Sequence, residues 1–178
     1  MTTLAWLARL LRARSGLLIG ADKLYLLETR LQPLLQREGL PGLAALAARL
    51  RQASGTDALE AEVVEAMTTN ETLFFRDAKP FLHLAAHGLP AAAASRPPGQ
   101  PVRIWSAGAA SGQEAYSIAM VAAENPGALG GRAARILGTD IAAAPLARAQ
   151  AGAYSQFEVQ RGLPARRLLA HFQQGAEG

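Results

Sequence analysis

The residues best suited to chemistry gather around one stretch, 102–120, with the sequence VRIWSAGAASGQEAYSIAM. It begins as an apolar strand, passes through a turn of small residues from Gly108 to Gly112, and continues as an amphipathic helix. Small residues before a helix allow a polar cofactor to approach bare backbone N–H groups. The pattern is not G-x-G-x-x-G, so the turn alone is a weak signal, and tight packing of strand against helix remains an alternative.

Two acids occupy positions that suit a nucleoside cofactor. Asp140 follows a second short apolar run, 134–138, where a carboxylate can accept hydrogen bonds from a ribose diol. Glu114 lies in the first turn of the expected helix. A carboxylate there could bind an amino group, but it also complements the helix dipole without any ligand. For Glu114, position alone favours the structural interpretation.

Polar and apolar residues are mixed in the segment 67–77, MTTNETLFFRD. Its T-x-x-E pattern has the form of a capping box and predicts that a helix begins here. Thr72 and Arg76 would then share one helical face, and a guanidinium fork is suited to a carboxylate. Asn70 is the third polar candidate. On spacing alone, an ordinary capped amphipathic helix explains the segment best.

Several other chemistries are disfavoured. His83 and His87 have the spacing of a helical metal pair, but no third ligand is evident, so we expect no metal site. Neither a G-x-S-x-G motif nor a Walker loop occurs. The chain has no cysteine, which fits a reducing compartment. With no apolar run near the roughly 20 residues of a membrane span and no signal-peptide order of residues, we expect a cytoplasmic protein.

The elements that position these residues follow from hydrophobic spacing. Leucines at helical spacing between residues 4 and 68 predict a bundle of four helices. We expect Asp22 to cap the second helix and Pro33 to kink or break it. We expect Thr56 or Asp57 to cap the fourth helix.

The remainder predicts a connecting helix to about His87, and then a surface loop or linker over the Ala-, Pro- and Gly-rich stretch 88–101. A strand, a helix, a second strand and a helix over 142–151 follow with short connections, which predicts a right-handed parallel unit. A last helix is expected over 164–172. The predicted division is an all-α domain over 1–80, a connecting helix and linker over 81–101, and a partial Rossmann-like domain over 102–178.

Charge is distributed unevenly along the chain, whose net charge is +4. Residues 1–55 contain eight basic and three acidic residues, a net +5, so the remainder carries about −1. A basic helical module suggests an acidic partner, either nucleic acid or an acidic protein surface, although a plain solvated helix face is an equal alternative. Nucleic acid is the least favoured of these, because the expected aromatic platform is missing.

Taken together, TTNETLFFRD, RIWSAGAASGQEAYSIAM, ILGTDI and AGAY closely resemble the chemotaxis receptor glutamate methyltransferases of the CheR type. The resemblance runs from about Gly20 to Phe172. It implies methyl transfer from S-adenosylmethionine to glutamate side chains on chemoreceptors, with S-adenosylhomocysteine as product. The implied partner is the acidic cytoplasmic helices of the receptors, with no nucleic acid and no membrane insertion. The alternative is a non-catalytic CheR-like module that binds an acidic signalling partner.

The resemblance also implies roles for individual residues. Asn70, Thr72 and Arg76 would contact the cofactor, Arg76 at its methionine portion. Glu114 would bind the methionine amino end, and Asp140 the nucleoside. No catalytic residue is assigned, because a substrate glutamate is already ionised near pH 7 and needs no general base.

The chain departs from the family pattern in two places. The usual Gly-Glu-Glu-Pro-Tyr run appears here as GQEAY, so one acid is a glutamine and the proline is an alanine. Family members also continue with further strands and a small β-subdomain. We therefore expect this chain to be an incomplete methyltransferase with weak cofactor binding and an open sheet edge.

Overall fold

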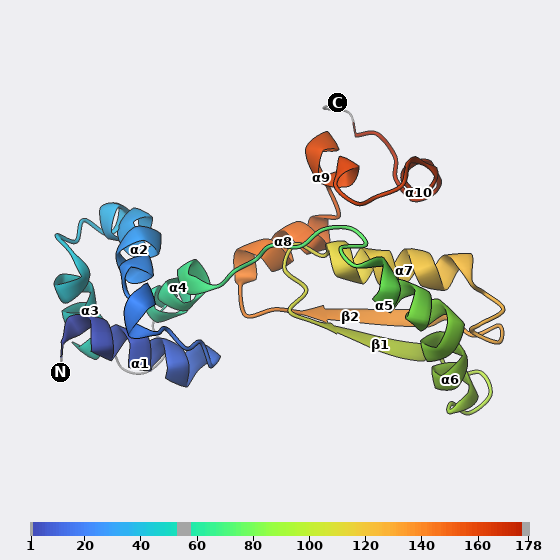
Figure 1. Ribbon diagram of the computed structural model, residues 1–178, viewed down its shortest axis with the longest axis horizontal. Helices are drawn as coiled ribbons and strands as arrows, with labels where there is room; N and C mark the ends of the chain where they lie inside the picture. The colour runs from blue at the N-terminus through green and yellow to red at the C-terminus, as the bar shows by residue number, and fades with distance from the viewer. Residues whose placement is uncertain (1, 53–57, 176–178) are drawn as a thin grey trace. The chain divides into compact units, whose positions relative to one another are not determined.

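The computed structural model describes residues 2–52 and 58–175 (Figure 1). Its contacts divide the chain into two compact units, 1–69 and 70–178. The sequence places the polar segment around Thr72 at the end of an all-α domain that reaches residue 80. In the structure this segment lies with the second unit.

Helices make up the first unit. Its elements are α1 (Thr3–Ser15), a 3₁₀ turn η1 (Ala21–Lys23), α2 (Tyr25–Arg37), α3 (Leu43–Gln52) and α4 (Ala58–Met67). The completely buried side chains of its core are Leu7, Leu11, Leu27, Leu31, Leu46, Ala47 and Val63. One apolar stripe from each helix therefore builds a common core, as the leucine spacing predicts.

The start of α2 differs from the prediction. Asp22 does not cap this helix, because it lies inside η1 and α2 begins three residues later, at Tyr25. The residue at the cap position, Leu24, makes no side-chain capping bond. The 3₁₀ turn already coils the chain before α2, so no side-chain cap is needed at Asp22. The other predicted caps, Thr56 and Asp57, lie outside the described residues.

Pro33 does not break α2, which continues to Arg37. Proline removes one backbone donor and crowds the preceding turn. Leu31, Leu34 and Leu35 on either side of it are nevertheless buried in the core. The packing of these leucines outweighs the local cost and holds the helix together.

The second unit contains two strands flanked by helices (Figure 1). Its elements are α5 (Ala78–His83), a π-helical turn η2 (Leu84–Gly88), α6 (Leu89–Ala94), β1 (Val102–Ala107), α7 (Gln113–Glu124), β2 (Ala134–Thr139), α8 (Ala143–Ala151), α9 (Gln156–Gln160) and α10 (Ala165–His171). β1 and β2 pair in parallel, in a register that runs from Val102 opposite Ala134 to Ala107 opposite Thr139. Because α7 connects them, this is the predicted strand–helix–strand unit.

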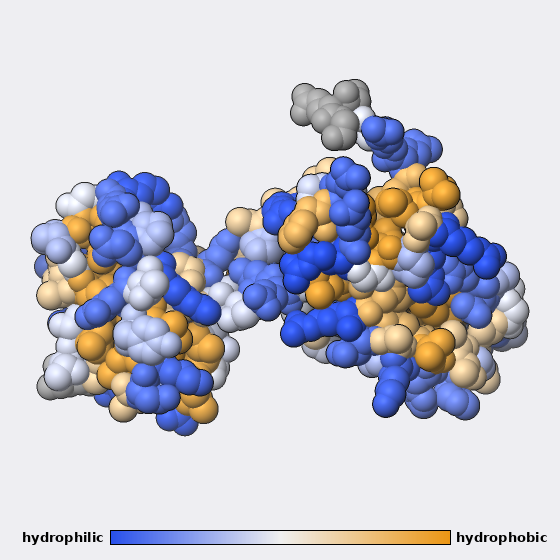
Figure 2. All heavy atoms as spheres, turned by 45° about the horizontal axis from the view of Figure 1, so that its top comes forward, coloured by the Kyte–Doolittle hydropathy of each residue, from blue (hydrophilic) through white to orange (hydrophobic). Residues whose placement is uncertain are grey.

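The two faces of this small sheet differ. Side chains alternate between the faces of a strand, and one face, with Val102 and Ser106, is buried. On the other face Trp105 and Leu137, which are paired in register, are 69% and 63% exposed. Figure 2 shows hydrophobic surface lying between hydrophilic side chains on this unit. The expected open, half-covered sheet is therefore present in the described residues.

The stretch predicted as a loop, 88–101, is helical in its first half. Helix continues from α5 through η2 into α6, and Leu89 and Ala93 are buried. Pro90 lies in the first turn of α6, where a missing N–H costs little. The loop prediction failed because composition alone does not reveal that two of these residues pack into a core.

The sequence also missed α9. Ser155 caps this short helix, and Glu158 returns a hydrogen bond to the Ser155 backbone, which completes a capping box. Within residues 2–52 and 58–175, no helix has the length and apolar character needed to traverse a membrane.

Candidate functional site

The turn between β1 and α7 uses left-handed backbone at three positions. Gly108, Ala110 and Gly112 have φ angles of +74°, +45° and +93°. A Cβ on Gly112 would lie 2.8 Å from the Ala149 Cβ, so α8 leaves room only for glycine. A Cβ on Gly108 would meet nothing within 4 Å. Packing therefore explains Gly112, whereas the backbone at Gly108 is open to a ligand.

Asp140 fastens this turn to the end of β2. Its Oδ2 accepts a hydrogen bond from the Ala110 N–H at 2.7 Å, and its Oδ1 accepts one from the Ala142 N–H at 2.9 Å. The side chain thus stands at the carboxyl end of β2, beside the turn. Each carboxylate oxygen has a second lone pair, so these bonds leave acceptor capacity for a ligand hydroxyl.

The segment between α4 and α5 is not the predicted helix. Thr68 Oγ1 donates to the Glu65 carbonyl at 2.7 Å, so it closes α4 and does not begin a new helix. Regular helix starts only at Ala78. Phe75 has a φ of +50°, which no α-helix accepts. Thr72 and the arginine at position 76 therefore do not share a helical face.

A cavity of about 460 Å³ nevertheless brings several candidates together. Thr72 and Arg76 reach it from the irregular segment, Glu114 from the first turn of α7, and Gly108 from the turn. Two further acids, Glu71 and Asp77, also line it, and apolar side chains contribute the rest of its wall, among them Phe81, Leu84, Ile104 and Ile118. An acid and an arginine from distant parts of the sequence thus line one partly apolar cavity.

Ser106 orients Glu114, one of the acids that line this cavity. Its hydroxyl donates to Glu114 Oε1 at 2.8 Å, and the serine is only 1% exposed. Sequence reasoning did not select Ser106. The available signal was a polar residue at an inward position of an apolar strand, facing the helix that follows.

Asn70 lines a neighbouring cavity of about 360 Å³, together with Gln113 and Arg161. Thr72 and Arg76 line both cavities. Asp140 lies outside both cavities and reaches the site through its bond to the turn. The structure therefore gathers Thr72, Arg76 and Glu114 in one cavity and places the remaining two candidates next to it.

Tyr154, the last residue of the AGAY motif, forms a hydrogen bond to the turn. Its hydroxyl donates to the Ser111 carbonyl at 2.6 Å. Burial, together with the nearby Tyr116, raises the pKa of the Tyr154 phenol above its ordinary value of about 10. The phenol therefore remains a neutral donor under physiological conditions.

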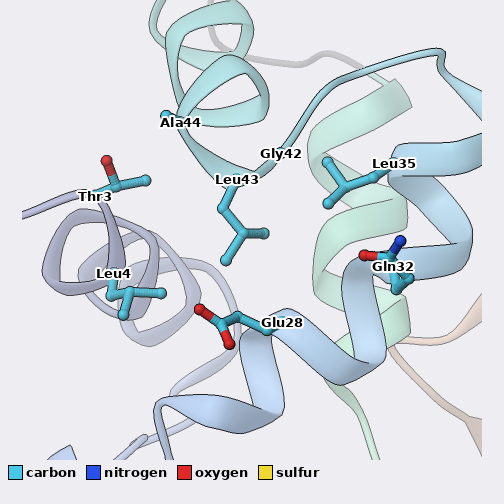
Figure 3. A pocket seen from close by; sticks show the side chains of 8 residues that line it. All are labelled: Thr3, Leu4, Glu28, Gln32, Leu35, Gly42, Leu43 and Ala44. Atoms are coloured by element: carbon cyan, nitrogen blue, oxygen red, sulfur yellow. The ribbon is translucent and has the colours of Figure 1, made fainter.

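The first unit has a hollow of its own, of about 430 Å³ (Figure 3). Thr3 and Leu4 of α1, Glu28 of α2 and Leu43 of α3 line it. None of the site residues predicted from the sequence is part of its lining. As a candidate site it holds one carboxylate among mainly apolar side chains.

Charge in the first unit is more balanced than its first 55 residues suggest. Residues 1–69 contain eight basic and seven acidic residues, a net +1, and the second unit carries +3. Two of the acids that follow residue 55 form ion pairs with basic residues of the earlier helices, Glu60 with Arg14 and Glu62 with Arg37. The predicted asymmetry is thus wrong for the folded unit, because α4 brings its acids back onto the basic helices.

His83 and His87 lie close together, as two ligands of one metal ion would. The rings of His83 and His87 are 4.9 Å apart between centroids. Among the residues that the structure describes, no group of three or more His, Cys, Asp or Glu side chains could hold a metal ion.

Comparison with known families agrees with both units. The family described as "CheR methyltransferase, all-alpha domain" matches residues 2–68, and "CheR methyltransferase, SAM binding domain" matches residues 70–178. The chain belongs to the CheR methyltransferase family. This confirms the resemblance, the fold class of a helical domain followed by a partial Rossmann-like domain, and S-adenosylmethionine as the cofactor.

Individual relatives are similar over most of the chain. The chemotaxis protein methyltransferase of Vibrio anguillarum is 39% identical over 175 residues, which cover 96% of this chain and 62% of the relative. Chemotaxis protein methyltransferase Cher2 of Pseudomonas putida is 40% identical over 161 residues, 88% of this chain and 58% of the relative. The Escherichia coli K12 chemotaxis protein methyltransferase is 31% identical over 95% of this chain and 56% of its own length. The chain thus spans about three fifths of the length of these relatives.

The cavity beside the turn fits this cofactor chemically. The methionine portion of S-adenosylmethionine carries an ammonium and a carboxylate, and the cavity offers a carboxylate at Glu114 and a guanidinium at Arg76. The open backbone at Gly108 allows close approach.

Proposed function

We propose that this chain forms the helical and cofactor-binding parts of a protein-glutamate O-methyltransferase that acts on chemoreceptors. The observation that carries the proposal is the single cavity lined by Arg76, Glu114 and the open turn at Gly108. In this proposal Arg76 holds the carboxylate of the methionine portion, and Glu114 holds its ammonium.

The remaining candidates complete the cofactor contacts. Asn70 and Thr72 approach from the irregular segment, and Asp140 accepts hydrogen bonds from the nucleoside. Asp140 has a second role, because its carboxylate also accepts a hydrogen bond from the Ala110 N–H and so holds the turn. Loss of its carboxylate would therefore disturb both the ligand contact and the wall of the site.

When bound, S-adenosylmethionine would supply a methyl group on a positively charged sulfur, for transfer to an acceptor carboxylate oxygen with the sulfur left as a neutral thioether. The chain's residues fix the position of the donor and have no proton to move, since the acceptor is ionised near pH 7. Their contribution is alignment of the reacting atoms. Ile104 and Ile118 give the cavity a partly apolar wall, and a drier surrounding favours a step in which opposite charges cancel.

The proposed partners are the acidic cytoplasmic helices of receptors, and the proposed location of the protein is therefore the cytoplasm. The net charge of the first unit is only +1, so support for an acidic partner comes from one basic patch and not from the unit as a whole. Arg9 and Arg12 are exposed on α1 and line one hollow with Trp6. Neither arginine has a carboxylate partner among the described residues. This patch also supports the second candidate, a non-catalytic module that binds an acidic signalling partner.

Calorimetric titration with S-adenosylhomocysteine tests cofactor binding. Arg76→Ala and Glu114→Gln each remove a charge-assisted contact, worth about 1.5–3 kcal/mol, so the Kd rises about tenfold or more. Arg103→Ala is the matched control, because Arg103 is exposed on a sheet strand and lines neither cavity. Equal Kd values for all three variants would refute the proposed cavity.

Transfer of a radiolabelled methyl group to receptor cytoplasmic fragments tests the reaction. The Vibrio anguillarum relative serves as the positive control, with Asp140→Ala compared with the parent chain. Cofactor binding without transfer, combined with retention of an acidic receptor fragment, would favour the binding module over the enzyme.

A further inference from the structure

The segment that carries Thr72 and Arg76 turns a sharp corner at Phe74 and Phe75. The Phe74 side chain is completely buried, and Phe75 has a φ of +50°. Left-handed backbone at a residue with a Cβ costs about 1–2 kcal/mol. The Phe75 N–H donates to Ser117 Oγ at 3.1 Å. A corner of this kind persists only where surrounding contacts determine it.

The chain between α9 and α10 touches the backbone of this corner. Gly162, in the connection between these helices, has a φ of +94°. A Cβ added to it would lie 2.0 Å from the Phe74 carbonyl oxygen and 3.2 Å from its carbonyl carbon. No real Cβ tolerates such a distance, so any side chain here displaces the Phe74 backbone.

Arg167 of α10 holds the second residue of the corner. Its guanidinium carbon lies 4.0 Å from the centre of the Phe75 ring. The same guanidinium forms a two-pronged bond to the Glu124 carboxylate at the end of α7, with distances of 2.9 Å from Nε and 2.7 Å from Nη2. This bond lowers the pKa of Glu124. Arg167 therefore fixes Phe75 relative to the helix that also carries Glu114.

Aromatic contacts complete the attachment. Phe172, just after α10, packs edge-on against Phe74 with ring centroids 5.6 Å apart. Tyr154 does the same from before α9, at 5.0 Å. The residues from 154 to 172, here called the C-terminal arm, thus enclose the corner with both backbone and side chains.

We propose that the C-terminal arm positions the cofactor-binding segment, and that Gly162 and Arg167 are positioning residues for the methyltransferase site. The inference rests on the proposed function of Thr72 and Arg76. These two residues lie within two positions of the corner and belong to no helix or strand. A displacement of about 1 Å is enough to lower the rate of an aligned reaction about a hundredfold. A shift of the Phe74 backbone moves both side chains in the cavity.

The test compares Gly162→Ala with Gly99→Ala. Gly99 also has positive φ, +77°, but a Cβ there would meet nothing within 4 Å. Both variants share the backbone strain, and only Gly162→Ala pushes on Phe74. By amide hydrogen exchange, Phe75 should exchange at least about tenfold faster in Gly162→Ala than in Gly99→Ala. The Kd for S-adenosylhomocysteine should rise about tenfold in Gly162→Ala alone.

Arg167 supplies the second set of variants, which also serves if Gly162→Ala fails to fold. Arg167→Gln should weaken S-adenosylhomocysteine binding several-fold, and Arg167→Lys should recover part of the loss by keeping the ion pair. Arg166→Gln, an exposed neighbour, should change nothing. If the parent chain does not bind S-adenosylhomocysteine, the proposed function fails, while Phe75 exchange still tests the arm. Unchanged Phe75 exchange in both Gly162→Ala and Arg167→Gln would overturn the inference.

Discussion

Two regions form the walls of the candidate site, and they are built by different means. The turn 107–112 is held by its own strand–helix–strand unit, with Asp140 and the Thr139 carbonyl accepting its N–H groups. The segment 70–77 has no regular structure and depends on partners much later in the chain. The Phe75 N–H donates a hydrogen bond to Ser117, 42 positions later in the chain, and the Phe74 carbonyl lies against Gly162. The turn is therefore held mainly by its flanking strands and helix, with added contacts from Ala149 and Tyr154, whereas the course of the segment is set by contacts with distant parts of the chain.

The largest effect is expected within the turn, for Gly112→Ala. The new Cβ would combine positive φ, costing about 1–2 kcal/mol, with a clash against Ala149, costing about 1–3 kcal/mol. Gly108→Ala carries only the first cost, because its Cβ meets open space. Urea denaturation should therefore show Gly112→Ala to be the less stable by about 1–3 kcal/mol. Equal losses would mean that the turn is not fixed by packing on α8.

Ser117→Ala tests the segment in the same way. Ser117 is completely buried, and its Oγ accepts the Phe75 N–H. Alanine would leave that N–H without its acceptor, at a cost of about 1–3 kcal/mol. Ser95→Ala is the control, because the Ser95 hydroxyl bonds a carbonyl in an exposed position. A loss no larger than that of Ser95→Ala would show that the corner holds without Ser117.

This difference explains which features the sequence predicts. The spacing of apolar residues and the run of small residues correctly predict β1, the turn, α7 and β2, because the pattern that is typical of each lies in consecutive residues. The same reasoning wrongly predicts a helix from the T-x-x-E pattern near Thr68. That pattern closes α4, and nothing near it in sequence reveals that Phe74 is buried against a distant arm. Composition fails over 88–101 for the same reason, since Leu89 and Ala93 are helical because they pack.

A smaller effect is expected for Ser106→Ala, which changes only a contact inside the local unit. The Ser106 hydroxyl donates to Glu114 at 2.8 Å, and Glu114 is exposed and can be hydrated instead. The loss of stability should be about 0.5–1.5 kcal/mol. Calorimetry should show a several-fold rise in the Kd for S-adenosylhomocysteine, because Glu114 loses its orientation. A change in stability without a change in Kd would separate Ser106 from cofactor binding.

The smallest effect links the two regions through Tyr154. Its hydroxyl donates to Ser111 in the turn, and its ring packs on Phe74 in the segment. Burial raises the pKa of Tyr154 in the folded chain, whereas an unfolded tyrosine has a pKa of about 10. The folded state therefore keeps its proton when the unfolded state begins to lose it. The resulting stability is complete below pH about 10 and is lost as the pH rises above that value.

Urea midpoints between pH 8 and 10.5 should reveal this loss as a difference between the parent and Tyr154→Phe. Phenylalanine lacks the bond to Ser111, so the variant is less stable at pH 8. The variant has no phenol to ionise at this position. The difference in free energy of unfolding between the two chains should therefore narrow as the pH rises, by less than about 1 kcal/mol at pH 10.5. A gap that stays constant would mean that Tyr154 ionises equally easily in both states, and that the contact joining the turn to the segment does not exclude water.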